Sequence, residues 1–432
     1  MKDGLESMGA KIGRLMGTAA LASILWIGSS LPALAQAGDL DLTFSGDGIA
    51  RTNFTPRGDF AWAIAVQADG KIVAAGASGG GRHFALARYS TDGRLDTTFG
   101  GDGRVVTPMT TADDIIHAVE FQADQRIVVA GQVGGKGGRY GLARYNTDGS
   151  LDTSFGGDGR VMTNLTRSWD LAWGLAVQPD GGIVAVGASG FAGGGFSAVR
   201  YLPNGRVDTT FSVDGKAMNN FTSGDDWAWD VALQADGKIV VAGIASASRS
   251  DRLVAMLRYN GDGTLDTAFS GDGKLTRNVT RGWDDASGVE IQPDGKIVTA
   301  GAVGGFGGRL LVLRFDADGR LDPTFSGDGI AAANFTRRDD FAWDLTLQTD
   351  GKVVAAGTAG IGAGEGSFAV ARYGTGSRLD SSFGGDGKVV TDVTTGIDVA
   401  TAVAVQADGA IVVGGEIGRT GGRFGVARYL AA

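Results

Sequence analysis

Residues Val66 to Gly76 read Val-Gln-Ala-Asp-Gly-Lys-Ile-Val-Ala-Ala-Gly, and this stretch recurs along almost the whole chain. The stretch begins with the end of an alternating segment, continues with an Asp-Gly pair and ends in an apolar β-branched run that stops at a glycine. This order is typical of a β-hairpin. Near-copies begin at six later positions: Phe121, Val177, Leu233, Ile291, Leu347 and Val405. One such hairpin is marginally stable by itself. The near-copies must therefore pack on one another, and the chain is predicted to be a repeat protein.

Two further elements accompany each hairpin and define the repeat. An Arg followed by Tyr or Phe returns every 56 or 58 residues from Arg88 to Arg428, and a Leu-Asp-x-x-Phe element begins at Leu40 and recurs to Leu379. Each unit has room for four short antiparallel strands, so seven units predict an all-β, seven-bladed β-propeller. A β-helix is the structural rival, but its coils are shorter and parallel and lack two hairpin turns each.

The two ends of the repeat region predict how the ring closes. The first Leu-Asp-x-x-Phe element has no Arg-Tyr before it, and the last Arg-Tyr, at Arg428, has no Leu-Asp-x-x-Phe after it. We therefore expect residues 40–53 to complete the blade that is built from residues 399–429. A ring closed in this way has no exposed sheet edge at the junction.

Residues 1–37 are predicted to be a secretory signal peptide, and residues 38–432 a single propeller domain. Lys2, Lys11 and Arg14 precede an apolar run from about Leu15 to Ile27, and small residues follow it. This order is typical of a signal with an Ala-x-Ala site, cut after Ala35 or Ala37. A membrane anchor is the alternative, but the apolar run is short for a span. We expect no membrane span after cleavage.

Composition limits the partners and the chemistry. The formal net charge is −9, which argues against nucleic acid and against an anionic membrane surface as partners. The chain has no cysteine, which removes disulfides, thiolate metal sites and a cysteine nucleophile. The 75 glycines recur at fixed places, as turns of an all-β fold require. We expect a monomer.

One Asp of each repeat is predicted to form an ion pair with the Arg eight residues before it. Arg88 with Asp96 and Arg144 with Asp152 are the first two pairs. The unmatched Arg428 is expected to pair with the unmatched Asp41 across the closure. Seven equivalent anion or metal sites are the functional alternative.

A second set of aspartates precedes the first hairpin strand of each unit, with a Thr four residues earlier. The first four are Asp59, Asp114, Asp170 and Asp226. Short polar side chains at a strand entrance satisfy backbone N–H groups, which favours a structural role. Calcium binding is the alternative, and it would make the protein a calcium-stabilised surface adhesin. We expect no other cofactor.

The tryptophans outside the signal fall before or within the first hairpin strands. Trp62, Trp173, Trp229 and Trp343 have the alternation parity of the apolar residues that follow, so we expect them to pack between blades. The others are expected on the surface, among arginines, on the face that also carries the glycine-rich loops. This candidate ligand surface consists of Trp169, Trp227, Trp283, Arg167, Arg281 and Arg337. Aromatic and charged groups together suit a glycan or a protein partner.

His117, Glu120 and Glu290 are the weak candidates for catalysis. His117 with Glu120 is the one cluster that resembles general acid–base chemistry. A spacing of three along a strand directs two side chains to opposite faces, which counts against their cooperation. The enzymatic alternative is an extracellular or periplasmic hydrolase or lyase with these groups near the central channel. An open channel lined by all three would favour that alternative.

The motifs resemble the bacterial delta-60 repeat family. Residues 66–76, 87–93 and 95–103 carry the family's pattern, which is Gln-x-Asp-Gly-Lys-Ile-Val-x-Ala-Gly, then Ala-Arg-Tyr-x-x-Asp-Gly, then Leu-Asp-x-x-Phe-Gly-x-x-Gly. The resemblance implies a propeller-like repeat domain in secreted or surface proteins of bacteria, and it assigns no activity and no site. The sequence therefore favours a secreted, non-enzymatic binding or scaffolding module, located outside the cell, in the periplasm or on the cell surface.

Overall fold

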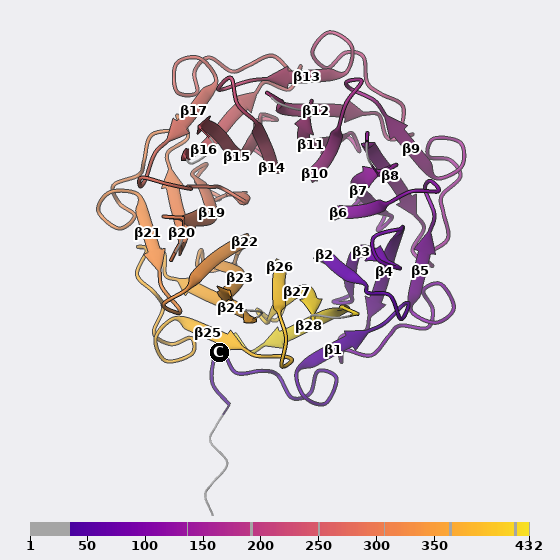
Figure 1. The fold of residues 1–432 in the computed structure, drawn as a ribbon, viewed down its shortest axis with the longest axis vertical. Coiled ribbons are helices and arrows are strands. Elements are labelled where there is room, and N and C mark those ends of the chain that lie inside the picture. The colour runs from indigo at the N-terminus through magenta and orange to yellow at the C-terminus, as the bar shows by residue number, and fades with distance from the viewer. Residues whose placement is uncertain are drawn as a thin grey trace, which may run out of the picture. The chain divides into compact units, whose positions relative to one another are not determined.

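Seven four-stranded antiparallel sheets surround a central axis, and the predicted seven-bladed β-propeller is confirmed (Figure 1). The structure is a computed structural model that describes residues 35–431, apart from 136, 191–192, 249–250, 306, 363–364 and 419–420. The ring belongs to the unit Gln36–Ala432. Most of the segment expected to be a signal peptide, residues 1–34, lies outside the described residues.

Each blade has an innermost strand beside the axis and three strands outside it. The innermost strands are β2 (Phe60–Val66), β6 (Asp114–Phe121), β10 (Asp170–Val177), β14 (Asp226–Leu233), β18 (Gly288–Ile291), β22 (Asp339–Leu347) and β26 (Asp398–Val405). The second strands are β3 (Ile72–Ser78), β7 (Ile127–Val133), β11 (Ile183–Ser189), β15 (Ile239–Ser248), β19 (Ile297–Val303), β23 (Val353–Gly362) and β27 (Ile411–Ile417).

The third and outermost strands complete the blades. The third strands are β4 (His83–Tyr89), β8 (Arg139–Tyr145), β12 (Gly195–Tyr201), β16 (Asp251–Tyr259), β20 (Arg309–Phe315), β24 (Glu365–Tyr373) and β28 (Arg423–Tyr429). The outermost strands are β5 (Arg104–Thr107), β9 (Arg160–Thr163), β13 (Lys216–Asn219), β17 (Lys274–Arg277), β21 (Ile330–Ala333), β25 (Lys388–Thr391) and β1 (Ile49–Thr52). Hairpin turns join the first three strands of each blade.

The first strand of the chain closes the ring by joining the last blade. Strand β1 pairs antiparallel with β28, with Ile49 opposite Ala427, so one blade has the order β1-β28-β27-β26 (Figure 1). The segment before β1 is also held, because the Gly38 N–H donates to the carbonyl oxygen of Leu430 at 2.9 Å. The two ends of the repeat region therefore share one sheet, as the unmatched motifs predict.

The core lies between neighbouring blades. Strands β3 and β4 are buried along almost their whole length because each face of their sheet meets another blade. Val73 and Leu86 of one blade share a cluster with Ile127 of the next. The Phe of each Leu-Asp-x-x-Phe element is fully buried, as Phe99 shows. This repeated packing fixes the seven innermost strands around the axis.

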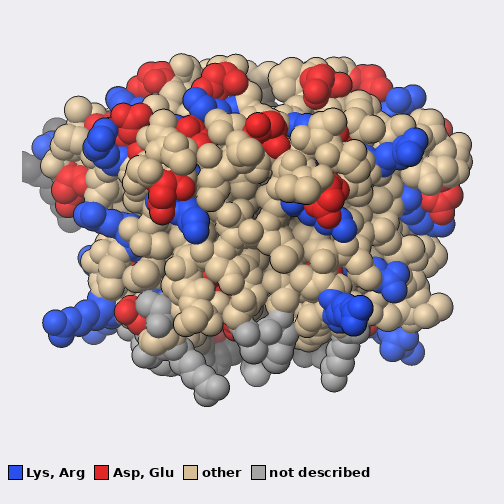
Figure 2. Space-filling model, turned by 90° about the horizontal axis from the view of Figure 1, so that it is seen from above, with Lys and Arg blue, Asp and Glu red and all other residues tan. Residues whose placement is uncertain are grey.

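Lys and Arg side chains are interspersed with Asp and Glu side chains on the side of the ring that Figure 2 shows. Many belong to short-range pairs in turns, such as Lys71 with Asp69 at 3.2 Å. Exposed pairs of this kind contribute little to stability. Within the described part of the chain, no helix is long and apolar enough to cross a bilayer.

Candidate functional site

A cavity of about 430 Å³ lies on the axis of the ring, and all seven innermost strands or the residues that lead into them contribute to its wall. One layer of the wall consists of equivalent residues, one from each blade. These residues are Trp62, His117, Trp173, Trp229, Ser287, Trp343 and Thr401. The cavity thus brings one position of the repeat together seven times, and the side chain at that position varies.

A β-bulge directs this layer into the cavity. In six innermost strands the register with the second strand skips one residue, which is Trp173 in β10. The other skipped residues are Trp62, His117, Trp229, Trp343 and Thr401. A bulge places two residues opposite one and turns the strand. The bulged side chains therefore face the axis instead of the neighbouring blade.

The glycine that ends each hairpin motif is explained by this bulge. Gly187 lies opposite the bulge of β10, and a Cβ on it would lie 1.8 Å from the carbonyl oxygen of Leu171. The equivalent distance for Gly76 is 1.9 Å, to the carbonyl oxygen of Phe60. No side chain fits there, so the bulge requires a glycine at this position.

The prediction that Trp62, Trp173, Trp229 and Trp343 pack between blades is wrong, because all four line the cavity. That prediction assumed that successive side chains point to alternate faces along the whole strand. The bulge interrupts this alternation at the tryptophan itself. The same feature corrects the argument about His117 and Glu120. Both line the cavity although they are three residues apart.

Four aromatic rings of neighbouring blades form a continuous arc on one side of the cavity. The ring centroids are 5.4 Å apart for Trp62 and His117, 3.9 Å for His117 and Trp173, and 4.7 Å for Trp173 and Trp229. The Trp62–His117 and Trp173–Trp229 spacings are typical of edge-to-face aromatic pairs, and His117 lies still closer to Trp173. The indole N–H groups of Trp62, Trp173 and Trp343 have no hydrogen-bond partner among the described residues. The arc therefore offers apolar faces together with donors that a ligand can use.

His117 is a neutral member of this arc. Neither ring nitrogen has a hydrogen-bond partner among the described residues. Burial lowers the pKa of the imidazole to about 3, so it carries no charge at neutral pH. A catalytic histidine is usually oriented by a hydrogen bond to a third group. No described carboxylate forms such a bond with His117.

Four carboxyl groups form a second layer of the cavity wall. Asp230 and Asp344 directly follow bulged tryptophans, and Glu120 and Glu290 lie three residues beyond the bulge position. Sequence reasoning missed the two aspartates. Their signal was present, because the other blades have Ala or Gly at that position of an apolar strand.

Burial raises the pKa of each of these carboxyl groups, and repulsion by neighbouring acids adds to the rise for Glu120, Glu290 and Asp344. The pKa of Glu120 rises to about 7 through burial and the nearby charges of Asp230 and Asp344. The pKa of Glu290 rises to about 8 through burial and the charges of Asp230 and Glu120. Glu120 still touches water in the open cavity, and this hydration opposes the rise. Part of the layer is thus protonated near neutral pH.

Asp230 and Asp344 also join neighbouring blades. Asp230 accepts hydrogen bonds from its neighbour Val231 at 2.8 Å and from Val289 of the next blade at 2.9 Å. Asp344 does the same with Leu345 and with Val403 of the next blade. Burial raises the pKa of Asp230 to about 6 although both backbone N–H groups favour its charged form. These two carboxyl groups are therefore held rigidly.

The predicted surface tryptophans lie on the glycine-rich-loop face. Trp169 and Trp283 are 42% and 43% exposed. The guanidinium of Arg252 lies 4.3 Å from the Trp283 ring, a cation–π contact. Trp227 is half-buried and meets Trp229 edge-to-face at 5.7 Å, which connects this face to the aromatic arc. The predicted arginines of this face, Arg167, Arg281 and Arg337, are exposed.

The aspartates before the first hairpin strands are buried and saturated with hydrogen bonds. Asp59 accepts bonds from the N–H groups of Phe54, Thr55 and Gly79 and from the Thr55 hydroxyl. Of the other aspartates that were considered for calcium, Asp114 and Asp226 accept the four equivalent bonds. Asp170 accepts three of them, from the Leu165 and Thr166 N–H groups and the Thr166 hydroxyl. Within the described ranges, no group of three or more His, Cys, Asp or Glu residues could hold a metal ion.

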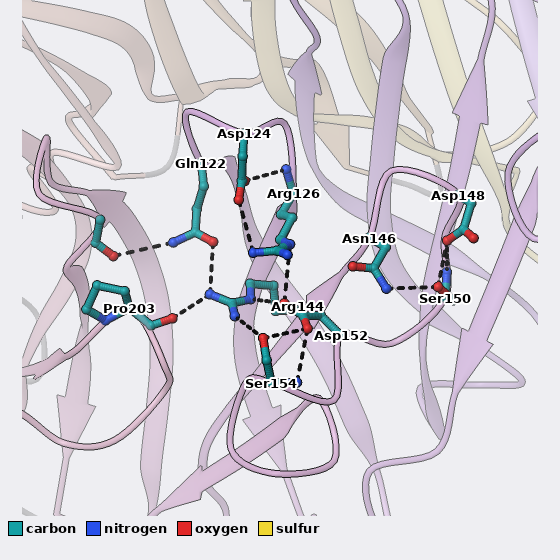
Figure 3. A network of polar contacts seen from close by, with 11 residues as sticks. Gln122, Asp124, Arg126, Arg144, Asn146, Asp148, Ser150, Asp152, Ser154 and Pro203 are labelled. Carbon is teal, nitrogen blue, oxygen red and sulfur yellow. Dashed lines mark hydrogen bonds and ion pairs between the residues drawn. The ribbon is translucent and has the colours of Figure 1, made fainter.

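An Arg–Asp pair lies in each blade, far from the cavity wall. Arg144 Nε donates to Asp152 Oδ2 at 2.7 Å, and the guanidinium also reaches the carbonyl oxygen of Pro203 in the next blade (Figure 3). The remaining pairs are Arg88–Asp96, Arg200–Asp208, Arg258–Asp266, Arg314–Asp322, Arg372–Asp380 and Arg428–Asp41. Partial burial disfavours the charge of Asp96, but the Thr98 hydrogen bonds and Arg88 outweigh it and lower its pKa to about 2. These pairs link blade to blade and complete the scaffold.

Seven segments of the chain match the family described as "Domain of unknown function (DUF5122) beta-propeller". They are residues 67–99, 122–155, 178–211, 234–269, 292–325, 348–383 and 406–431, together more than half of the chain. The chain therefore belongs to this family. No curated protein shows significant sequence similarity to it.

Solved structures with a similar fold include two lyases. A catalytically inactive virginiamycin B lyase from Staphylococcus aureus with quinupristin is 10% identical, with a TM-score of 0.52 over 88% of this chain and 99% of that one. A streptogramin B lyase is also 10% identical, with a TM-score of 0.53 over 88% and 97%. At this identity the likeness concerns the fold alone.

Proposed function

We propose that the protein is a secreted, non-enzymatic binding module of the propeller class whose ligand enters the central cavity. The aromatic arc carries this proposal. Trp62, His117, Trp173 and Trp229 line a cavity of about 430 Å³. The ring nitrogens of Trp62, His117 and Trp173 have no hydrogen-bond partner among the described residues. Apolar walls with a few polar groups are typical of small-ligand sites.

The ligand that fits this wall has a compact apolar face, such as a sugar ring or a side chain of a peptide. Trp227 and the exposed Trp169 and Trp283 continue the aromatic surface on the glycine-rich-loop face. A longer glycan or a protein segment would contact this surface with one part and the cavity with another. Secretion is supported by the apolar run before Ala35 and by the resemblance to repeats of surface proteins.

A thermal-melt panel of glycans, peptides, small amines and metal ions tests this proposal. A ligand at about 100 times its dissociation constant stabilises a protein by about 2.7 kcal/mol. We expect a hit whose shift is lost in Trp173→Ala and kept in Trp283→Ala, which removes an indole outside the cavity. If no ligand gives a shift that depends on Trp173, the proposal is wrong.

A hydrolase or lyase is the second candidate, and one observation favours it. His117, Glu120 and Glu290 all line the cavity, and the raised pKa of Glu120, about 7, suits a general acid or base near neutral pH. The unpaired, neutral His117 counts against it. Product analysis after incubation with the same panel decides between the candidates, because an enzyme converts its ligand and loses that activity in Glu120→Gln.

A further inference from the structure

The charge of the cavity wall restricts the chemical class of its ligand. Among the described residues that line the cavity, four are acidic and none is Lys or Arg. The single other titratable group in this lining, His117, is neutral at physiological pH. A positive ligand would relieve the repulsion among Glu120, Asp230, Asp344 and Glu290, whereas a neutral sugar would leave it in place.

The aromatic layer has the same preference. A cation over the face of a tryptophan is attracted by the ring quadrupole, and the effect grows when water is excluded. Trp173 and Trp229 meet edge-to-face at 4.7 Å, and Trp62 lies 6.1 Å from Trp173, so three indoles wall one side of the cavity. The carboxyl groups are one and three residues beyond the bulge, about 3–10 Å further along the axis. An ammonium group with its substituents spans such a distance.

The spacing of the acids favours an organic cation over a metal ion. Calcium needs six to eight oxygen ligands within about 2.3–2.6 Å. The four carboxyl groups come from β6, β14, β18 and β22, and no set of three described acids or histidines converges enough to share a metal ion. Asp230 and Asp344 are also fixed by backbone N–H groups of the next blade, which keeps them apart.

We propose that the central cavity binds an organic cation. Its amine or quaternary ammonium group lies against the indoles of Trp173 and Trp229 on one side and faces the carboxylates of Glu120 and Glu290 on the other. This inference rests on the proposed function and specifies its ligand. Binding should release protons, because a positive ligand stabilises the charged forms of the four acids. It should also weaken with added salt to the extent that the cavity is open to water.

The test compares choline with its neutral isostere 3,3-dimethylbutan-1-ol, titrated into the purified protein and followed by tryptophan fluorescence and calorimetry. The two probes have the same shape and differ in charge. We expect choline to bind at least about tenfold more tightly, a difference of about 1.4 kcal/mol. We also expect tighter choline binding at pH 8.5 than at pH 5.5, because more of the four carboxyl groups are then ionised.

Variants separate the charge from the aromatic wall. Glu120→Gln with Glu290→Gln should weaken choline binding about tenfold and leave the isostere unchanged, whereas Trp173→Ala should weaken both. The matched controls are Glu365→Gln, an exposed acid paired with Arg338 outside the cavity, and Trp283→Ala. Both controls should bind choline as the unmodified protein does, and a melt of each variant checks that it is folded.

The outcomes distinguish this inference from the proposed function. Equal binding of choline and the isostere, or Trp173-dependent binding of a neutral sugar alone, overturns the cation and keeps the binding module. Calcium binding that depends on the same acids, without any binding of choline, also overturns the organic cation. If no probe of any class, including the peptides and glycans of the panel, binds in a way that depends on Trp173, both proposals are wrong.

Discussion

Arg144 and Asp152 have counterparts in every blade, whereas Trp173 has counterparts in only some. The Arg–Asp pairs form an outer belt in which each blade makes the same contact with the next. The cavity layer has Trp, His, Ser or Thr at one equivalent position. The belt is symmetric because a closed ring of seven blades needs the same blade–blade contact seven times. A ring of seven identical groups could not orient a small ligand, so we infer that the asymmetry of the cavity reflects binding.

The largest expected effect comes from the glycine that the bulge requires. In Gly187→Ala the new Cβ would lie 1.8 Å from the carbonyl oxygen of Leu171, and backbone must move to admit it. We expect destabilisation by at least about 3 kcal/mol in denaturant unfolding. Gly376→Ala is the control, because nothing lies within 4 Å of its added Cβ. Equal stability of the two variants would contradict the close approach of Gly187 to the backbone of β10 at the bulge.

A smaller loss is expected from the belt, without any loss of binding. Asp152→Ala leaves Arg144 buried without its carboxylate, which costs roughly 3 kcal/mol, the lower end for a buried pair, because this one lies near the surface. Asp158→Ala breaks an exposed contact with Arg160 and should cost less than about 1 kcal/mol. Choline titration of the folded Asp152→Ala protein should match the unmodified protein. A changed affinity would mean that belt and cavity are coupled.

The pH dependence of stability should differ between the two regions. Glu120 and Glu290 have folded-state pKa values of about 7 and about 8, above those of the unfolded chain. The folded protein therefore binds more protons than the unfolded chain, and the free energy of unfolding should fall as the pH rises from 6.5 to 8.5. His117, with its lowered pKa of about 3, acts in the opposite direction but only below about pH 6.5.

The aspartates of the belt lose their contribution to the free energy of unfolding in a different pH range. Asp96 has its pKa lowered to about 2, so its stabilisation is present above pH 4 and is lost as the pH falls toward 2. Denaturant unfolding at several pH values measures both ranges. Glu120→Gln with Glu290→Gln should flatten the decline between pH 6.5 and 8.5, and an unchanged slope would contradict the description of the cavity acids.

The smallest expected effect concerns the segment that closes the ring. Ala37 is buried against the last two blades, and its carbonyl oxygen accepts a hydrogen bond from the Gly384 N–H at 2.8 Å. A chain that begins at Gly38 should therefore be about 1 kcal/mol less stable than one that begins at Gln36. If the chain is exported as proposed, we expect mass spectrometry of the mature protein to find Gln36 as its first residue. A mature chain that starts at Gly38 with no loss of stability would contradict this.

The sequence predicted the scaffold better than the cavity. The repeated hairpin, the unmatched Leu40 and Arg428 motifs and their spacing sufficed for the number of blades and for the closure, because scaffold contacts repeat in every unit. The cavity depends on one extra residue in six inner strands. A single bulge reverses which face a side chain occupies, so alternation placed Trp62 and Trp173 wrongly. The invariant Gly76 was the available signal, since a strand-ending glycine can mark a bulge.

The central claim is that the ligand occupies the variable cavity and not the exposed tryptophans. A crystal structure of the protein with the tightest-binding ligand of the panel tests this claim most directly. We predict ligand density in the cavity against the indoles of Trp173 and Trp229, with its charged group directed toward Glu120 and Glu290. Density on Trp169 or Trp283, with the cavity filled only by water, would contradict the claim.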